Sequence, residues 1–383
     1  MTLTRLTLAA GAALTALPAL AQDETIKIAF AVPLTGDFAA YNEVAGAECM
    51  AKMINDDGGV GGRQIELLVQ DVGSDSQAAI SAVERFLGEN PVAIATIPFS
   101  DTMIPVAQIA SGTTILQAQS TQVEMHTGIV DNFLTNVSPD PYTATAAANY
   151  ALEQGVKNVV LFTSDDGGSW SAATPEWFGE VIEAGGGTVQ ASLNYSGGTT
   201  DWSPQIAELR ALDPAPDAVY ISWGVPDIGV LIRQMRAAGL DAWVVGSDGF
   251  DDPSLDALAE EDPALLDRVF FGTLAPSQSD SAVQAFMDQC AEIGSPVNGL
   301  FPALGADTVR IIAYGVETAG STDPTAVREA IRAAESIPVM SVDSVSFADT
   351  TSYAVREIPV IGFENGERVL LSLEVPENVP EWP

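Results

Sequence analysis

Two kinds of segment alternate along almost the whole chain. Short apolar, β-branched runs such as residues 65–69 and 92–96 are separated by stretches with helical spacing of apolar residues, such as 77–87. Strands that alternate with helices form a mainly parallel sheet, because each helix carries the chain back across a face of the sheet. The alternation covers residues 25–116 and begins again over 142–245. We therefore predict two α/β units of similar size.

The last third of the chain continues without a flexible linker. After Arg268 the chain runs V-F-F-G-T-L. Predicted helices follow at 282–292, 306–318 and 324–334, and residues 338–373 alternate in the manner of strands. A length of 383 residues suits two domains. Because no segment rich in Pro, Ser or Gly separates the units, we expect several strands to connect them closely.

The charge balance excludes some partners. The chain has 52 acidic and 15 basic residues, which gives a formal net charge of -37. Nucleic acids and anionic membrane surfaces are bound by basic patches. We therefore expect neither as a partner and interpret the acidic excess as a solvated surface.

The N-terminus has the pattern of a signal peptide. Arg5 precedes an apolar stretch at residues 6–17, and Ala19-Leu20-Ala21 forms a small-residue cleavage site. No other stretch approaches the 18 apolar residues of a membrane span. No Cys follows the apolar stretch closely, so a lipid anchor is not expected. We predict that residues 1–21 are removed and that the mature chain is a soluble exported protein.

Cys49 and Cys290 are the two cysteines of the chain. In an oxidising compartment they could form one disulfide, but they could equally be two buried thiols. With a single histidine, His126, they cannot build a Cys/His metal cluster. We expect no metal and no cofactor.

Common catalytic motifs are missing. The chain has no phosphate-binding loop, no dinucleotide-binding glycine pattern after a strand, and no nucleophile elbow. A Ser-His-Asp triad would need His126, which we interpret as a surface loop residue. Asp248, Asp251 and Asp252 approach the spacing of a calcium loop, but residue 259 is Ala where such a loop has an acid. We expect no catalytic residues, and we expect Asp251 and Asp252 to cap and begin the next helix.

Several motifs in order resemble the leucine/isoleucine/valine-binding proteins, the periplasmic receptors of branched-chain amino-acid ABC transporters. The resemblance covers residues 25–363. It implies a type I periplasmic binding protein fold: two lobes, each a mainly parallel sheet flanked by helices, joined by three crossover strands at a hinge. The expected division is residues 22–139 with 274–350 in one lobe and 140–273 with 351–383 in the other. The motifs are IAFAVPLTG at 28–36, GAE at 46–48, NDDGGVGGR at 55–63, DIG at 227–229, RQMRAAGL at 233–240 and GSDG at 246–249.

The resemblance also implies ligand-binding residues in the first lobe. Ser100 matches a serine that binds the ligand's carboxylate, although it could be only a helix cap. Thr121 matches a threonine with the same role, and Gln119 matches a position that binds through its backbone. Tyr41 matches an aromatic residue at the mouth of the cleft, and its alternative is packing on the helix that follows.

In the second lobe, the sharpest correspondence is Asp248, which matches an acid that binds the ligand's α-ammonium group. Trp170 stands where members of that family carry a tyrosine that covers the ligand side chain, and its alternative is a tryptophan of the core. Trp223 lies one residue before Gly224, the position that matches another tyrosine of that family. Tyr142, like Asp140, lies at the crossover between the lobes, where a contact is plausible.

The resemblance implies an exported, periplasmic receptor that binds an α-amino acid with a branched-chain or other apolar side chain. Its expected partners are the permease subunits of an ABC transporter in the inner membrane, and we expect a monomer. The alternatives are another small solute in the same fold (an amide, urea, or an aromatic or other carboxylic acid), an enzyme acting in the cleft, or a sensor module.

Overall fold

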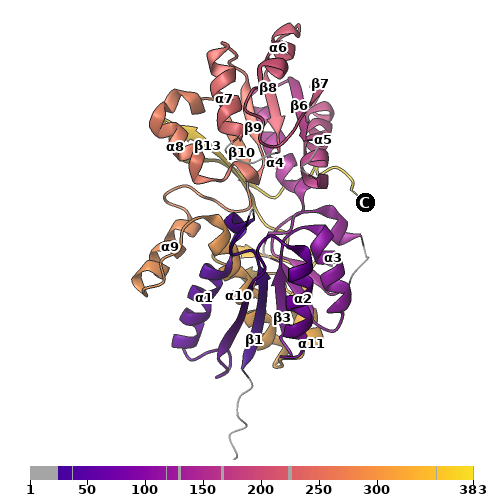
Figure 1. The fold of residues 1–383 in the computed structure, drawn as a ribbon, viewed down its shortest axis with the longest axis vertical. Helices are drawn as coiled ribbons and strands as arrows, with labels where there is room; N and C mark the ends of the chain where they lie inside the picture. The colour runs from indigo at the N-terminus through magenta and orange to yellow at the C-terminus, as the bar shows by residue number, and fades with distance from the viewer. Residues whose placement is uncertain are drawn as a thin grey trace, which may run out of the picture.

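The computed structural model describes residues 25–36, 38–117, 119–127, 131–164, 168–222, 227–350 and 352–382. The predicted signal peptide lies outside these residues. The described chain forms two lobes stacked along the long axis, with the C-terminus between them (Figure 1).

Lobe 1 contains a five-stranded parallel sheet in the order β2-β1-β3-β4-β5. Helices cover both of its faces, and they include three that follow most of lobe 2 in the sequence (α9, α10 and α11). The strands are β1 (Ile26–Val32), β2 (Ile65–Asp71), β3 (Ala93–Thr96), β4 (Thr114–Gln117) and β5 (Phe133–Thr135), and a two-stranded sheet pairs β11 (Ile337–Pro338) with β12 (Ser344–Val345). The helices are η1 (Ala39–Tyr41), α1 (Val44–Asp56), α2 (Ser76–Leu87), α3 (Ser100–Ile109), η2 (Val123–His126), α9 (Ala282–Glu292), α10 (Leu300–Ala319) and α11 (Pro324–Arg332), where η marks a 3-10 helix.

Lobe 2 contains a seven-stranded sheet in the order β14-β13-β10-β9-β8-β6-β7. The five neighbouring strands β10, β9, β8, β6 and β7 are parallel to one another. The C-terminal hairpin β13–β14 adds an antiparallel edge. The strands are β6 (Asn158–Ser164), β7 (Thr188–Tyr195), β8 (Ala218–Ile221), β9 (Trp243–Gly246), β10 (Val269–Gly272), β13 (Ile358–Glu364) and β14 (Glu367–Glu374). The helices are α4 (Asp140–Glu153), α5 (Gly168–Ala184), α6 (Ser203–Ala211), α7 (Asp227–Ala237), η3 (Asp248–Phe250), α8 (Pro253–Glu261) and η4 (Pro263–Leu266).

The chain passes between the lobes three times. The first passage follows β5, the second follows β10, and the third lies between β12 and β13. The first and third run side by side, because Thr135 pairs with Tyr353 in a parallel bridge. Arg356 of the third passage is buried and donates to the backbone oxygen of Asn136 in the first, at 2.9 Å. The predicted two-lobed α/β fold is confirmed.

Helices α1 and α10 pack closely because glycines lie at their contact. A Cβ on Gly46 would lie 1.7 Å from the backbone oxygen of Pro302, and one on Gly305 would lie 2.0 Å from the backbone oxygen of Glu43. Any larger side chain would force the helices apart. This contact joins the first helix of lobe 1 to a helix that the chain adds only after completing most of lobe 2.

The two cysteines are bonded to each other. Cys49 on α1 and Cys290 on α9 form a disulfide with their Cα atoms 5.8 Å apart, a usual separation for this bond. Both residues are fully buried. Of the two alternatives left by the sequence, the structure has the disulfide.

His126 differs from the expectation of a surface loop residue. It ends the 3-10 helix η2 and is partly buried, and its Nδ1 lies 2.8 Å from the hydroxyl of Ser352. Its ring packs within 5.3–5.7 Å of Phe133, Tyr353 and Trp382. The polar sequence around His126 concealed these aromatic partners, two of which come from the last 31 residues of the chain.

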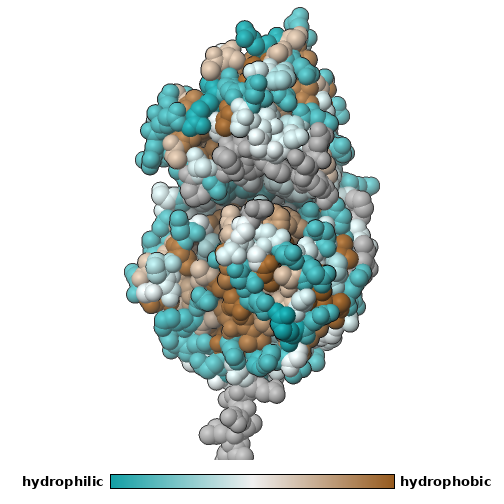
Figure 2. Space-filling view, viewed as in Figure 1, coloured by the Kyte–Doolittle hydropathy of each residue, from teal (hydrophilic) through white to brown (hydrophobic). Residues whose placement is uncertain are grey.

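The surface agrees with the charge balance. On the face shown in Figure 2, hydrophilic residues cover much of both lobes, with apolar patches between them. In the described part of the chain, none of the helices combines the length and the apolar character needed to span a bilayer.

Candidate functional site

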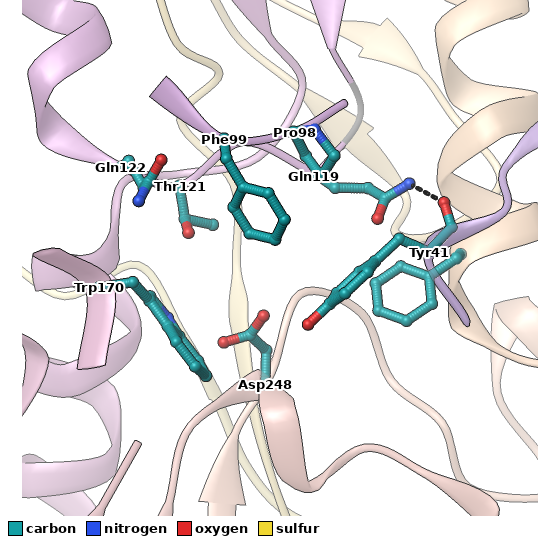
Figure 3. A pocket seen from close by; sticks show the side chains of 9 residues that line it. Tyr41, Pro98, Phe99, Gln119, Thr121, Gln122, Trp170 and Asp248 are labelled. Atoms are coloured by element: carbon teal, nitrogen blue, oxygen red, sulfur yellow. Dashed lines mark hydrogen bonds between the residues drawn. The ribbon is translucent and has the colours of Figure 1, made fainter. Parts of the chain in front are cut away.

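A small cavity lies between the lobes (Figure 3). Its free space is about 30 Å³, enough for only a few water molecules. A solute the size of an amino acid can therefore enter only when the surrounding side chains or the lobes move. The lining residues are Tyr41, Pro98, Phe99, Gln119, Thr121, Gln122, Trp170, Asp248 and Phe301.

The fold places these residues at the carboxyl ends of strands. Pro98 and Phe99 follow β3, Gln119 and Thr121 follow β4, and Asp248 follows β9. The carboxyl ends of parallel strands lie at one edge of each sheet, which is where open α/β sheets bind ligands. The cavity therefore lies where the binding edges of the two sheets meet.

Asp248 is the one lining residue with an ionisable carboxyl group, and none of the nine lining side chains is basic. Its carboxylate points into the cavity toward Tyr41 and Trp170 (Figure 3). Burial raises the pKa of Asp248 to about 6, and the nearby Asp251 carboxylate adds to the shift. A carboxylate in this position is stabilised by a cation, and the lining residues do not supply one.

The loop that carries Asp248 is fixed from behind. Asp251 forms an ion pair with Arg368 of β14 and accepts a hydrogen bond from the Thr273 hydroxyl at 2.7 Å. Arg368 also donates to Asp256 at 2.8 Å. Asp252 caps α8 by accepting from the backbone N–H of Ser254 at 2.8 Å. The sequence predicted Asp251 as the cap of this helix and Asp252 in its first turn. The cap is Asp252 instead, and Asp251 pairs with Arg368, 117 residues away.

The acids near Asp248 do not form a metal site. Within the described ranges, no group of three His, Cys, Asp or Glu side chains could hold a metal ion. Asp251 and Asp252, the two acids that follow Asp248, are already engaged by Arg368 and by the start of α8.

Aromatic rings make the lobe 1 side of the cavity apolar. The Tyr41 ring lies 5.8 Å from that of Phe99 and 5.1 Å from that of Phe301, both edge to face. Burial and the nearby Asp248 carboxylate raise the pKa of Tyr41 to about 12, so its hydroxyl keeps its proton. Trp170 lies across the cavity on the lobe 2 side (Figure 3).

A polar network lies behind these rings. The Gln119 side chain donates to the backbone oxygen of Tyr41 at 2.7 Å. Gln117 accepts from the backbone N–H of Thr96 at 2.8 Å and donates to the Glu43 carboxyl at 3.2 Å. Glu43 is fully buried, and desolvation raises its pKa to about 8. This carboxyl group is therefore mostly neutral at pH 7.

The first backbone N–H group of α3 already has a hydrogen-bond partner within the chain. The backbone N–H of Ser100 donates to the side-chain oxygen of Gln122 at 2.7 Å. The backbone N–H of Asp140 donates to the backbone oxygen of Thr121 at 2.8 Å, and the Asp140 side chain is buried near Asp248. Burial, and to a smaller extent the Asp248 charge, raise the pKa of Asp140 well above its usual value.

The structure brings together five of the eight residues that the sequence placed in the ligand site. Ser100 and Tyr142 are not among the lining residues, and the Tyr142 hydroxyl lies 3.1 Å from that of Tyr353 instead. Trp223 lies outside the described residues. The five lining residues are Tyr41, Gln119, Thr121, Trp170 and Asp248.

Sequence reasoning missed four lining residues. Pro98 and Phe99 directly follow β3, and Gln122 follows Thr121, so their positions after strands could have identified them. Phe301 lies in the first turn of α10, far along the chain, and no local pattern links it to the cavity.

Comparisons with known proteins agree with the two-lobed fold. A sequence profile of the periplasmic binding protein family matches residues 25–366. The leucine-, isoleucine-, valine-, threonine- and alanine-binding protein of Pseudomonas aeruginosa is 26% identical over 318 residues, which is 81% of this chain and 83% of that protein.

Solved structures share the fold. The branched-chain amino acid substrate-binding protein LivJ of Streptococcus pneumoniae, in complex with isoleucine, superposes with a TM-score of 0.75 at 22% identity, over 92% of this chain and 99% of that one. A solute-binding protein of R. palustris in complex with benzoate superposes with a TM-score of 0.74 at 20% identity, over 92% and 97%. With the profile matching nearly all of the described residues, the chain belongs to the periplasmic binding protein family.

Proposed function

We propose that this chain is the solute-binding receptor of an ABC importer and binds an α-amino acid with a branched-chain or other apolar side chain. The observation that supports this most is Asp248, a carboxylate aimed into a small aromatic cavity without a basic neighbour in its lining. An α-ammonium group would pair with Asp248 through charge-assisted hydrogen bonds. The apolar side chain would pack against Tyr41, Phe99 and Phe301.

The relatives support the same class of ligand. The Pseudomonas relative is named for aliphatic amino acids and threonine, and the Streptococcus structure holds isoleucine. We propose that the ligand docks on lobe 1 and that hinge closure brings Trp170 and Asp248 onto it. The closed form would then be recognised by permease subunits in the inner membrane. In this role the protein is an exported, periplasmic monomer and not an enzyme.

A carboxylic acid without an amine is the main alternative, since one solved neighbour holds benzoate. The chemistry of this cavity disfavours it. A benzoate-like ligand would bring a negative charge toward Asp248 and leave that carboxylate unpaired, and burying an unpaired charge is costly.

Calorimetric titration of leucine into wild type and Asp248→Asn tests the proposal. We expect the substitution to weaken leucine binding about tenfold or more, since a charge-assisted hydrogen bond contributes ~1.5–3 kcal/mol. Asp280→Asn, at an exposed acid, is the matched control and should bind like wild type. Equal affinities for wild type and Asp248→Asn, or binding of isocaproate as tight as that of leucine, would overturn the proposal.

Recovery of the ligand after binding separates a receptor from an enzyme. We expect leucine to be released chemically unchanged, as mass spectrometry would show. A product whose formation is lost in Asp248→Asn would instead identify a cleft enzyme.

A further inference from the structure

The side-chain amide of Gln119 is only half satisfied. Its Nε2 donates to the backbone oxygen of Tyr41 at 2.7 Å. A backbone oxygen only accepts hydrogen bonds, so the amide nitrogen must face Tyr41 and the amide oxygen must face away from it. That oxygen, Oε1, is buried and has no hydrogen-bond partner among the residues that the structure describes. One contact therefore fixes the orientation of the amide and leaves a single acceptor unused.

The unused acceptor belongs to the cavity. Gln119 is one of the lining residues, its exposed fraction is only 7%, and its oxygen lies on the cavity side of the amide in Figure 3. Folded proteins leave few buried acceptors unpaired, because such a group loses its hydrogen bond to water and gains none in return. A hydrogen-bond donor that enters the cavity would remove this cost, whereas an apolar group would leave it in place.

Gln119 and Asp248 face the cavity from different lobes. Asp248 follows β9 of lobe 2, whereas Gln119 follows β4 of lobe 1 and its amide is held against the backbone of Tyr41. The ring of Tyr41 packs on Phe99 and Phe301 and forms an aromatic wall with them. In the proposed function the ligand's ammonium group pairs with Asp248 and its side chain packs on this wall. A donor that reaches Gln119 therefore belongs on the ligand's side chain.

We propose that Gln119 is a specificity-determining residue whose Oε1 accepts a hydrogen bond from a hydroxyl group on the side chain of the bound amino acid. The inference rests on the proposed function and narrows it. The aromatic wall takes the hydrocarbon part of the side chain, and Gln119 favours a ligand with one donor over an apolar ligand of the same shape. A neutral donor suits this acceptor, because an amide carries no charge to balance a second cation.

Threonine and valine are matched probes, because they have nearly the same shape and differ by a hydroxyl in place of one methyl group. A site with a buried polar group that needs a partner discriminates against the analogue that lacks it. Titration calorimetry gives the ratio of the two affinities for each variant. Effects on anything that the two ligands share, including the position of Tyr41, cancel in that ratio.

Gln119→Met keeps the length of the side chain and removes the acceptor. We expect it to lower the ratio of threonine affinity to valine affinity about tenfold, mainly through weaker threonine binding. Gln119→Leu also lacks the acceptor and should shift the ratio in the same direction, so the result does not depend on one variant. Thermal unfolding checks that each variant is folded.

Gln154→Met is the matched control, since it makes the same chemical change at an exposed position of lobe 2 that does not line the cavity. It should leave the ratio of affinities unchanged. A fall in the ratio in this control as large as that in Gln119→Met would overturn the assignment, because the change would not depend on the cavity.

Glu43 is the competing donor within the chain. Its carboxyl group is mostly neutral at pH 7, and its Oε2 also lacks a partner among the described residues. If the proton of Glu43 satisfied the Gln119 oxygen, that oxygen would need nothing from a ligand. The ratio of threonine to valine affinity would then be the same in wild type and Gln119→Met, which overturns the proposal.

The remaining failures are distinguishable. Equal weakening of threonine and valine in Gln119→Met would assign the oxygen to a group that both ligands share, such as the ammonium, and would overturn the proposed role while the receptor function stands. Binding of leucine without binding of threonine or valine would also overturn only this inference. If none of the three amino acids binds the wild type, the proposed function fails and the inference fails with it.

Discussion

Three buried or partly buried carboxyl groups surround the cavity: Asp248, Asp140 and Glu43. Desolvation raises the pKa of each, because a charge is less stable away from water. For Asp248 and Glu43 the raised pKa values, about 6 and about 8, lie on either side of neutral pH.

The pKa of Asp248 leads to a prediction about binding. An ammonium group pairs with the ionised form, so binding below the pKa of about 6 must first remove a proton. We expect leucine affinity to fall as the pH drops through about 6, approaching tenfold per pH unit. Titration calorimetry across this range would measure it. In Asp248→Asn this acid dependence should be absent, and an unchanged dependence would assign it to another group.

Glu43 leads to a prediction about stability. Its pKa is raised in the folded state from 4.5 to about 8, so folding favours the neutral form. Its contribution to stability is complete below about pH 4.5 and is lost as the pH rises to about 8. A shift of this size corresponds to a stability change on the order of a few kcal/mol.

Glu43→Gln removes this titration while keeping a hydrogen-bonding side chain. We expect the difference in unfolding free energy between Glu43→Gln and wild type to grow in favour of Gln between pH 5 and 8, as measured by urea unfolding. Because Asp140 titrates in both proteins, only the difference between them is informative. A constant difference would mean that Glu43 is ionised throughout.

The sequence could locate some of these residues and not others. Asp248 and Thr121 were assigned to the site by the family resemblance, and both follow apolar strands, where open α/β sheets bind ligands. Glu43 lies at the start of a helix and looks like a solvated acid, since burial depends on α10 and Gln117, which are distant in the chain. Gln122, which also lines the cavity, was overlooked although it directly follows Thr121.

At the scale of helices and strands, the sequence predicted most of the order but misplaced several ends. β5 has only three residues, too few for a periodic pattern, and was not predicted. Proline is favoured in the first turn of a helix, so Pro175 predicts a helix start at that residue, yet α5 begins at Gly168 and contains that proline. α10 begins six residues before its predicted start, because Pro302 and Gly305 conceal its periodicity although they pack against α1.

The disulfide gives a prediction at this scale. It joins α1 to α9 across 241 residues of sequence, and a long closed loop restricts the unfolded chain strongly. We expect replacement of both cysteines by Ala to lower the free energy of unfolding by about 3–5 kcal/mol, as measured with urea. Dithiothreitol should destabilise the wild type and leave the double variant unchanged. Equal sensitivity of both proteins would contradict this.

At the scale of the whole molecule, the C-terminal tail adds a contact beside the three connecting passages. Trp382 follows the last strand of lobe 2, and its ring lies 5.7 Å from His126 of lobe 1 and 5.8 Å from Tyr353 of the third passage. An aromatic pair of this kind contributes about 0.5–1.5 kcal/mol beyond the area it buries. The tail therefore favours one arrangement of the lobes.

We expect Trp382→Ala to shift the unliganded protein toward an open arrangement, which small-angle X-ray scattering would detect as a larger radius of gyration. Trp243→Ala is the matched control, because Trp243 packs on Phe270 within lobe 2. It should reduce stability without changing the arrangement of the lobes. An equal radius of gyration for Trp382→Ala and wild type would show that the connecting passages alone set the arrangement.

The long span between Cys49 and Cys290 also determines how early the disulfide can form in the newly made chain. A polypeptide emerges from its N-terminus, and α9 to α11, which complete the core of lobe 1, follow almost all of lobe 2. The Cys49 thiol must therefore wait, unpaired, while 241 further residues appear. Because the chain has only one other cysteine, this delay carries no risk of a wrong intramolecular pairing. The disulfide therefore forms late and stabilises a chain that is already nearly complete.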